Sequence, residues 1–329
     1  MKVAVIGAGV IGITTAYELA TQGHQVSVFE RNGAAAEECS FSNTGVASAG
    51  YAAPWARPGM FKHVLTHLWQ RDTPLRISKL SMADWRWLWQ MRKACDSTTF
   101  ARNRESMLRL AEYSSHRMRT LTDTLNLEHE RSQGFMVLLR SERESRLMQD
   151  SLKVMRDAGL SFKTLSAEEA RNIEPALKPE TALAQAIHFP EDEVGNCRQF
   201  ALLLKNEAES LGVKFHFNTP IEPLSSAQPK TIRIAKQDLG EKFDAVVVCA
   251  GLASAQLVRP LGLRIPLVAV HGYAISAAVR EPLDAPRSGV MDEQYKVAIS
   301  RLGQRVRVSG GSEIGGSASR HDAASIKTL

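Results

Sequence analysis

The chain has 329 residues, of which 44% are hydrophobic and 23% charged, and this size predicts two intimately joined domains rather than one ordinary core. Its 41 basic and 35 acidic residues leave a net charge of +6, which is too diffuse to indicate a nucleic-acid partner and only mildly favours anionic surfaces. Four widely spaced cysteines without a CxxC pair argue for a reducing compartment and against a disulfide scaffold or a thiolate zinc site, and no metal site is predicted.

The first 23 residues carry a dinucleotide-binding pattern. Residues 2–6 predict a short apolar strand, Gly7, Gly9 and Gly12 follow in GxGxxG spacing, and apolar residues then recur at helical spacing until Gly23. In such a pattern the first glycine permits a tight turn, the second lets backbone approach a pyrophosphate, and the third lets helix and strand pack closely. The helix N-terminus would face the phosphates, so the apolar start is not interpreted as a secretory signal.

A second strand is predicted over residues 25–29, and it closes on Glu30. A carboxylate at this place accepts hydrogen bonds from an adenosine ribose and repels a 2′-phosphate, which disfavours NADP. The glycine pattern alone does not choose between NAD and FAD. The small polar segment 39–45 then suits the wrapping of an extended cofactor, with an ordinary solvated loop as the alternative.

A helix is predicted to begin at Ser81, with Asp84 completing a capping box. Its tryptophans and methionine fall on more than one face, and three cations lie between them. Two interpretations remain open: a helix resting on an anionic membrane surface, or a helix wedged between domains. The second is favoured, because an interfacial helix should confine its apolar residues to one face. No apolar run reaches the roughly 18 residues of a membrane-spanning helix.

The remaining segments predict an α/β cofactor domain interrupted by a second sheet. A strand over 134–139 begins that sheet, a short capped helix begins at Ser166, and a further capped helix begins at Asn196 and ends at Gly212. The run 244–251 predicts a central parallel strand buried on both faces. Short alternating segments after Pro266 predict an antiparallel sheet: 267–270, 273–276, 297–300 and 306–309.

The predicted fold class is α/β, with a Rossmann-like dinucleotide-binding domain and a second, mostly antiparallel α+β domain; the family resemblance given below implies that these are a FAD-binding domain and a substrate domain. The predicted boundaries are 1–130 and 192–260 for the discontinuous cofactor domain and 131–191 and 261–314 for the substrate domain. Residues 315–329 are small and polar and predict a frayed tail.

Several motifs resemble those of the D-amino acid oxidase superfamily of FAD-dependent amine oxidoreductases, in particular its bacterial D-amino acid dehydrogenase branch. They are the glycine pattern ending in Glu30-Arg31, the Ser-Phe-x-Asn-x-Gly segment within 39–45, and Val-Val-Cys-Ala-Gly at 247–251. Further marks are Gly-Tyr and Pro-Trp at 50–55, Gly134-Phe135, His-Gly-Tyr at 271–273 and the segment 308–313. The match covers nearly the whole chain.

The resemblance implies FAD as the cofactor and assigns residues to it. Those expected to bind FAD are Val5, Ile6, Gly7, Ala8, Gly9, Val10, Ile11, Gly12, Glu30, Arg31, Ser42, Asn43, Gly45, Ile221, Ala250 and Gly251. Tyr51, His271 and Tyr273 are substrate-side candidates, although each is a packed structural residue in the alternative interpretation. No catalytic residue is assigned, because oxidation of a neutral amine by direct hydride loss needs no strong side-chain base.

The implied reaction is oxidative deamination of a D-amino acid to a 2-oxo acid and ammonia, with electrons passed to a respiratory acceptor such as a quinone. The implied location is cytoplasmic, with peripheral contact at the cytoplasmic face of the inner membrane. Family members continue beyond this chain's end with a Gly-Leu-Arg-Pro segment and a Gly-His-Gly helix, which predicts impaired flavin retention and turnover. The alternatives are a non-catalytic dinucleotide-binding remnant and an oxidase of glycine, sarcosine or opines on the same fold.

Overall fold

The computed structural model describes residues 1–60, 75–235, 240–316 and 323–329. The chain divides into two compact units, each assembled from separated stretches of sequence. Unit 1 consists of Met1–Asn43, Leu127–His129 and Asn196–Val268, and unit 2 of Thr44–Asn126, Glu130–Gly195 and Ala269–Leu329.

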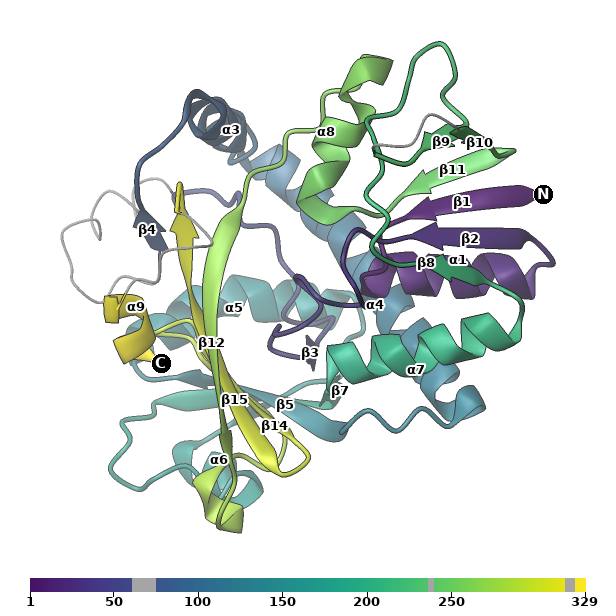
Figure 1. Ribbon diagram of the computed structural model, residues 1–329. Helices are drawn as coiled ribbons and strands as arrows, with labels where there is room; N and C mark the ends of the chain where they lie inside the picture. The colour runs from purple at the N-terminus through teal and green to yellow at the C-terminus, as the bar shows by residue number, and fades with distance from the viewer. Residues whose placement is uncertain (61–74, 236–239, 317–322) are drawn as a thin grey trace. The chain divides into compact units, whose positions relative to one another are not determined.

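Unit 1 is built on a parallel sheet. Its strands are β1 (Lys2–Ile6), β2 (Gln25–Phe29), β8 (Lys214–His216) and β11 (Ala245–Val248), in the order β11-β1-β2-β8. Helices α1 (Val10–Thr21) and α7 (Cys197–Ser210) pack against each other beside this sheet (Figure 1). The strand, glycine bend, helix and second strand predicted at the N-terminus are confirmed, and the side chain of Asn196 caps α7 as predicted.

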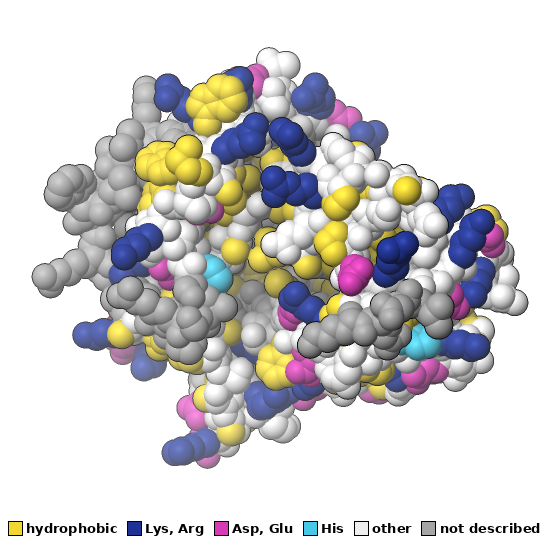
Figure 2. Space-filling view, turned by 45° about the horizontal axis from the view of Figure 1, so that its top comes forward, with side chains coloured by type: hydrophobic (Ala, Val, Ile, Leu, Met, Phe, Trp, Pro, Cys, Tyr) yellow, Lys and Arg dark blue, Asp and Glu magenta, His cyan; other side chains and the backbone are white. Residues whose placement is uncertain are grey.

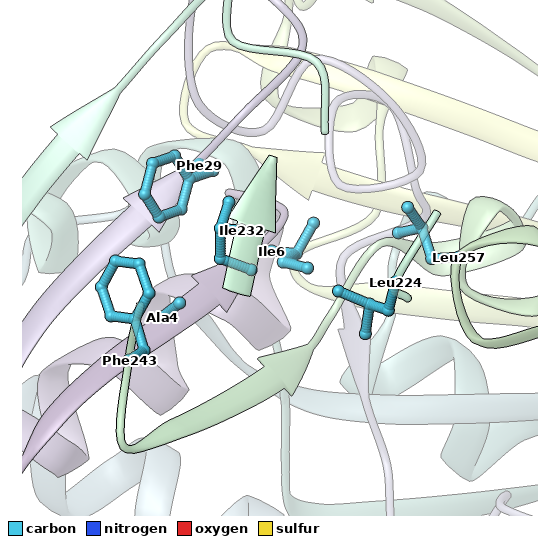
Figure 3. Close-up of a cluster of buried hydrophobic side chains, with 7 residues drawn as sticks. All are labelled: Ala4, Ile6, Phe29, Leu224, Ile232, Phe243 and Leu257. Atoms are coloured by element: carbon cyan, nitrogen blue, oxygen red, sulfur yellow. The ribbon is translucent and has the colours of Figure 1, made fainter. Parts of the chain in front are cut away.

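The other face of this sheet carries a separate cluster of buried hydrophobic residues. Side chains that alternate along β1 and β2 pack with one residue of the short helix α8 (Ser254–Val258) and with residues in and next to the antiparallel pair β9 (Thr231–Arg233) and β10 (Gly240–Lys242). Short 3-10 turns flank α8 at Gly251–Ala253 and Arg259–Leu261. The buried cluster, shown in Figure 3, consists of Ala4, Ile6, Phe29, Leu224, Ile232, Phe243 and Leu257.

The parallel strand expected over 244–251 is present as β11, which pairs with β1, but the expectation that it is central and buried on both faces is wrong. Strand β11 covers four residues, and within the described residues its one sheet partner is β1, which places it at the edge. All four of its residues are half-buried. The apolar run is explained by packing of Val246 and Val248 against the core cluster of unit 1 rather than by two neighbouring strands.

Unit 2 is built on a larger mixed sheet. In the described residues the main path is β12-β15-β14-β13-β5-β7-β3, with β4 added to β15 and β6 added to β7. The strands are β3 (Val46–Ala47), β4 (Leu75–Ile77), β5 (Ser132–Leu139), β6 (Lys163–Leu165), β7 (Gln185–Val194), β12 (Val270–Ala278), β13 (Gly289–Asp292), β14 (Val297–Leu302) and β15 (Arg305–Ile314). A 3-10 turn, Pro282–Asp284, follows β12. Most pairs are antiparallel, while β5 with β13 and β4 with β15 are parallel.

Strand β5 has a buried core on each of its faces. Phe135, Val137 and Leu139 pack with Leu152 and Met155 of helix α5 (Glu142–Asp157). The alternate residues Met136 and Leu138 pack with Ala170 of helix α6 (Ala167–Ile173). A strand buried on both faces explains why the sequence is continuously apolar there and predicts a strand correctly.

Two further helices of unit 2 are α3 (Met82–Lys93) and α4 (Ser97–Leu125). The capping box of Ser81 and Asp84 is present at the start of α3, as predicted. The side chain of Asp96 accepts hydrogen bonds from the backbone of Thr98 and Thr99 and so begins α4. None of the residues of α3 is buried, and the expected position of this helix between the domains stays a prediction.

Several boundaries differ from the prediction, and two of them are shifted by a few residues: 192–195 group with unit 2, and 261–268 group with unit 1. Residues 44–126 group with unit 2, because β3 and β4 pair with strands of its sheet. Residues 267–269 form no strand, and β12 begins at Val270. The expected frayed tail contains helix α9 (Ala323–Thr328), in which Ser325 is buried, while residues 317–322 of that tail lie outside the described residues.

Candidate functional site

The bend after β1 is fixed by backbone contacts that admit no side chain. Gly7 has φ +105°, and a Cβ built on it would lie 2.5 Å from the carbonyl oxygen of Cys249. Its N–H donates to the carbonyl of Phe29 at 2.8 Å. A Cβ on Gly12 would lie 1.9 Å from the carbonyl oxygen of Gly7. The bend, β2, β11 and the first turn of α1 therefore meet at backbone distance.

Gly9 differs from these two glycines. It precedes α1 and has an extended backbone conformation. A Cβ built on Gly9 would have one heavy atom of the described residues within 4 Å, which is Ser40 Oγ at 3.4 Å. The space beside Gly9 is therefore open, at the end of a helix whose first N–H groups point outward. The N–H of Val10 donates to Ser40 Oγ at 3.0 Å, while Ile11 is exposed. This is the geometry at which a helix N-terminus receives a phosphate.

Glu30 is buried at the end of β2, and both of its carboxylate oxygens accept hydrogen bonds from backbone. The N–H of Ala8 donates to Oε2 and the N–H of Asn32 to Oε1, each at 2.8 Å. A carboxylate offers about four acceptor positions, so about two remain for hydroxyl groups of a ligand. Glu30 thus links the glycine bend to the loop after β2, and its carboxylate keeps free acceptor positions for the hydroxyl groups of a ribose.

Arg31 is engaged within its own loop. Its Nε donates to Glu38 Oε1 at 2.7 Å, and Asn32 Nδ2 donates to the same oxygen at 3.1 Å. Burial acts to raise the pKa of Glu38, but these hydrogen bonds and the charge of Arg31 outweigh it and hold that pKa below its ordinary value. In the structure Arg31 therefore contacts a carboxylate, and its predicted role toward the cofactor stays a prediction.

The other predicted cofactor residues are distributed over both units. Ser42 is exposed in unit 1 and Asn43 is half-buried there, whereas Gly45 belongs to unit 2. At Gly45, φ is +75° and a Cβ would lie 2.2 Å from the carbonyl oxygen of Gly195, so packing explains this glycine. The polar segment 39–45 also contains Ser40, and its hydrogen bond with the start of α1 was not predicted from the sequence.

The remaining predicted residues surround the bend within unit 1. Val5 and Ile6 are buried in β1, and the carbonyl of Ala8 accepts from the N–H of Ala36 at 2.9 Å. Ile221 pairs with Ile234 in an isolated bridge and packs against the core cluster. Ala250 packs against the same cluster and lies beside the Gly7 bend, while Gly251 begins a 3-10 turn with φ +53°.

The substrate-side candidates lie in unit 2 in two groups, each with a carboxylate to which the sequence analysis assigned no role. Tyr51 donates its hydroxyl hydrogen to Glu293 Oε2 at 2.6 Å, and Lys296 forms an ion pair with the other oxygen of that carboxylate. Burial, with the charge of Glu293, raises the pKa of Tyr51 well above its ordinary value. The phenol therefore stays a hydrogen-bond donor.

The second group contains Tyr273 and His271 on β12. The hydroxyl of Tyr273 donates to Glu313 Oε2 at 2.9 Å, and Ser78 donates to the other oxygen. His271 pairs in register with Glu313. Within the described residues no group of His, Cys, Asp and Glu side chains has the arrangement of a metal site.

A half-buried acid, Asp192, lies next to the Tyr51 group. The hydroxyl of Ser48 donates to Asp192 Oδ2 and accepts from the N–H of Tyr51 at 3.2 Å. Burial raises the pKa of Asp192 to about 6, although the hydrogen bond from Ser48 and the charge of Arg119 act in the opposite direction. Asp192 therefore changes charge near neutral pH at the base of the loop that carries Tyr51.

Replacing Asp192 with asparagine is expected to change how stability depends on pH. The folded pKa of about 6 exceeds the ordinary 3.8, so between these values the folded chain binds more protons than the unfolded chain. The contribution of Asp192 to the free energy of unfolding is thus greatest below about pH 4, falls as pH rises, and is constant above about pH 6. Asp192→Asn removes this fall, so the variant gains up to about 3 kcal/mol relative to the parent between pH 4 and 7.

Urea unfolding of both proteins at a series of pH values measures this difference. Glu180→Gln, at an exposed carboxylate that is not among the groups shifting the pKa of Asp192, is the matched control and should change the free energy of unfolding by less than about 0.5 kcal/mol at each pH. Parallel pH profiles for the parent and Asp192→Asn would contradict the prediction.

Comparison with known proteins identifies the family. A model of the FAD-dependent oxidoreductases matches residues 2–329. The chain belongs to this family. A D-amino acid dehydrogenase of Bradyrhizobium diazoefficiens is 38% identical over 323 residues, which cover 97% of this chain and 77% of that relative. A D-amino acid dehydrogenase of Cereibacter sphaeroides is 40% identical over 319 residues, which cover 96% of this chain and 73% of the relative.

Solved structures confirm the fold class. Glycine oxidase from Geobacillus kaustophilus superposes with a TM-score of 0.73 at 21% identity, over 99% of this chain and 75% of that one. L-proline dehydrogenase from P. horikoshii superposes with a TM-score of 0.68 at 16% identity, over 99% of this chain and 74% of that one. The predicted FAD-dependence is confirmed by the family, which decides the choice between NAD and FAD that the glycine pattern left open.

The geometry of unit 1 fits FAD. The space beside Gly9 at the start of α1 suits a diphosphate, and the buried carboxylate of Glu30 retains acceptor positions for ribose hydroxyls. The other assignments to FAD, and the substrate-side assignments of Tyr51, His271 and Tyr273, stay predictions.

Proposed function

We propose that this chain catalyses the FAD-dependent oxidative deamination of D-amino acids to 2-oxo acids and ammonia. The observation that carries the proposal is its 38–40% identity, over nearly its full length, to two D-amino acid dehydrogenases. In the overall reaction the substrate loses the Cα hydrogen with two electrons and a proton from nitrogen, and water then releases ammonia. The electrons leave to an external acceptor.

FAD, when bound, supplies the redox chemistry of this reaction. The chain supplies binding and orientation: Gly7 and Gly12 hold the bend, Gly9 leaves room for the diphosphate, and Glu30 accepts ribose hydroxyls. We assign Arg31, Ser42, Asn43, Gly45, Ile221, Ala250 and Gly251 to the remaining cofactor contacts. On the substrate side, Tyr51 keeps its proton at the phenol oxygen, as its contact with Glu293 requires.

The acceptor and the location form a finer part of the proposal. The names of the relatives as dehydrogenases favour an acceptor other than oxygen, and we propose a respiratory acceptor such as a quinone. Peripheral contact with the cytoplasmic face of the inner membrane would bring the protein close to a quinone in that membrane. None of the helices in the described part of the chain is both long and apolar enough to cross a bilayer.

The absorbance spectrum of the purified protein, before and after anaerobic addition of D-alanine, tests the proposal. We expect the oxidised flavin spectrum at the start and its bleaching by D-alanine. L-Alanine, glycine and sarcosine are the matched controls and should leave the spectrum unchanged. Bleaching by glycine or sarcosine with release of peroxide in air would favour the oxidase alternative, and bound flavin that no amine reduces would favour a non-catalytic protein.

A further inference from the structure

Helix α3 carries large apolar side chains that are exposed in the part of the chain that the structure describes. Met82, Trp85 and Trp89 are 84%, 59% and 58% exposed. Their spacing of three and four residues places them along one side of the helix. Exposing two tryptophans and a methionine on a single helical face is unfavourable in water, so this face indicates a partner.

The other apolar residues of α3 have a different environment. Trp87, Leu88 and Met91 are half-buried and lie on the opposite side of the helix. The apolar residues of α3 therefore form two faces. One face is half-buried against the protein, and the other is exposed in the described part of the chain. This division removes the objection that an interfacial helix should confine its apolar residues to one side.

The exposed face of α3 is also cationic. Arg86, Arg92 and Lys93 are all exposed, and the Nζ of Lys93 lies 3.6 Å from the ring centre of Trp89. The one acidic residue of the helix, Asp84, is held in the capping box with Ser81. Figure 2 shows exposed hydrophobic side chains with Lys and Arg side chains directly beside them in its upper left part.

The segment before α3 is anchored to the sheet of unit 2. The N–H of Ser78 donates to the carbonyl of Ile314 at 2.9 Å, and β4 pairs with β15 immediately before it. A Cβ on Gly315 would lie 2.7 Å from the carbonyl oxygen of Lys79, so the two backbones are in direct contact. The start of α3 is thus fixed by backbone contacts.

We propose that the exposed face of α3, formed by Met82, Trp85, Arg86, Trp89, Arg92 and Lys93, is a docking surface for an anionic lipid bilayer. Tryptophan rings favour the headgroup level, and arginine and lysine bind lipid phosphates. A second copy of this chain fits the face less well, because a two-fold contact would bring the same cations against one another. The membrane contact proposed above would thus lie on helix α3, and vesicle binding can be measured independently of catalysis.

Co-sedimentation of the full chain with lipid vesicles tests the surface. We expect binding to phosphatidylcholine vesicles containing a quarter of phosphatidylglycerol, and weaker binding to phosphatidylcholine alone. The double variant Trp85→Ala, Trp89→Ala should lose about tenfold or more in partition coefficient on the anionic vesicles. Replacing Arg86, Arg92 and Lys93 with glutamine should cost about fivefold for each charge removed on anionic vesicles and much less on neutral ones.

The matched control is the double variant Leu110→Ala, Tyr113→Ala on α4. These side chains are 66% and 67% exposed, so exposed apolar surface is likewise removed elsewhere in unit 2, and vesicle binding should equal that of the parent. Trp85→Tyr, Trp89→Tyr keeps amphipathic aromatic rings and should retain most of the binding, which separates interfacial contact from a folding defect.

Undiminished vesicle binding by the Trp85→Ala, Trp89→Ala variant would overturn the proposal, as would equal binding of the parent to neutral and anionic vesicles. A parent that binds no vesicles but changes from dimer to monomer in light scattering when both tryptophans are replaced would assign the face to a second copy instead. Flavin bleaching by D-alanine is measured on the same samples, so a failure of the proposed activity is recognised separately from a failure of membrane binding.

Discussion

Gly12→Ala is expected to destabilise unit 1 by about 3 kcal/mol, whereas Gly9→Ala should cost less than about 1 kcal/mol. A methyl group on Gly12 would lie 1.9 Å from the carbonyl oxygen and 3.0 Å from the carbonyl carbon of Gly7. These are backbone atoms of the bend, so α1 must move away from β1 to relieve the contact. A methyl group on Gly9 meets only Ser40 Oγ among the described residues, at 3.4 Å, and Gly9 has extended dihedral angles that any residue adopts.

The effects on cofactor affinity should separate from the effects on stability. The methyl group of Gly9→Ala occupies the open space beside the start of α1, where we place the diphosphate, so the affinity for FAD should fall by about tenfold or more. Denaturant unfolding of the apoprotein and calorimetric titration with FAD measure the two effects independently.

Gly23→Ala is the matched control at the other end of α1. Gly23 has φ +79°, and no atom of the described residues lies within 4 Å of the place a Cβ would take, so the substitution costs about 1 kcal/mol of backbone strain and leaves FAD affinity unchanged. Equal stability of Gly12→Ala and the parent would contradict the close packing of α1 on the bend. Unchanged FAD affinity in Gly9→Ala would place the diphosphate elsewhere.

The elements that the sequence predicts correctly are those specified by neighbouring residues. The first strand, the glycine bend and α1 follow from apolar spacing and from glycines within 23 residues, and the capping boxes at Ser81 and Ser166 need only a partner three residues on. Strand β11 shows the limit of such reasoning. An apolar run reports burial, but it does not report how many strands lie beside it, and β11 is at an edge.

The candidate site divides in the same way. Gly7, Gly12 and Glu30 are predicted by a local pattern, and the structure brings them together at the end of β1 and β2. Glu293 and Glu313 are not predicted, because their partners Tyr51 and Tyr273 are 242 and 40 residues away and no local pattern records such a contact. Ser40 lies inside the segment 39–45, which was predicted to wrap the cofactor. The family resemblance assigned cofactor contacts to Ser42 and Asn43 in this segment and none to Ser40.

Glu30→Ala is expected to lower the free energy of unfolding by about 3 kcal/mol and to weaken FAD binding at least tenfold. The buried N–H group of Ala8 and the part-buried N–H group of Asn32 lose their acceptors, and a buried donor without a partner costs about 1–3 kcal/mol. The ribose loses an acceptor at the same time. Glu30→Gln keeps one amide oxygen for one of the two donors, so its loss of stability should be about half as large.

Glu38→Gln is the matched control for Glu30, because it removes a carboxylate from the same loop. Glu38 pairs with Arg31 at an exposed position, so its replacement should cost less than about 1 kcal/mol. Denaturant unfolding of the apoproteins and titration with FAD again measure both quantities. Unfolding of Glu30→Ala at the parent's denaturant concentration would contradict the two backbone contacts. Reduced stability with full FAD affinity would mean that Glu30 holds the bend to the loop after β2 and that the ribose hydroxyls are bound by another group.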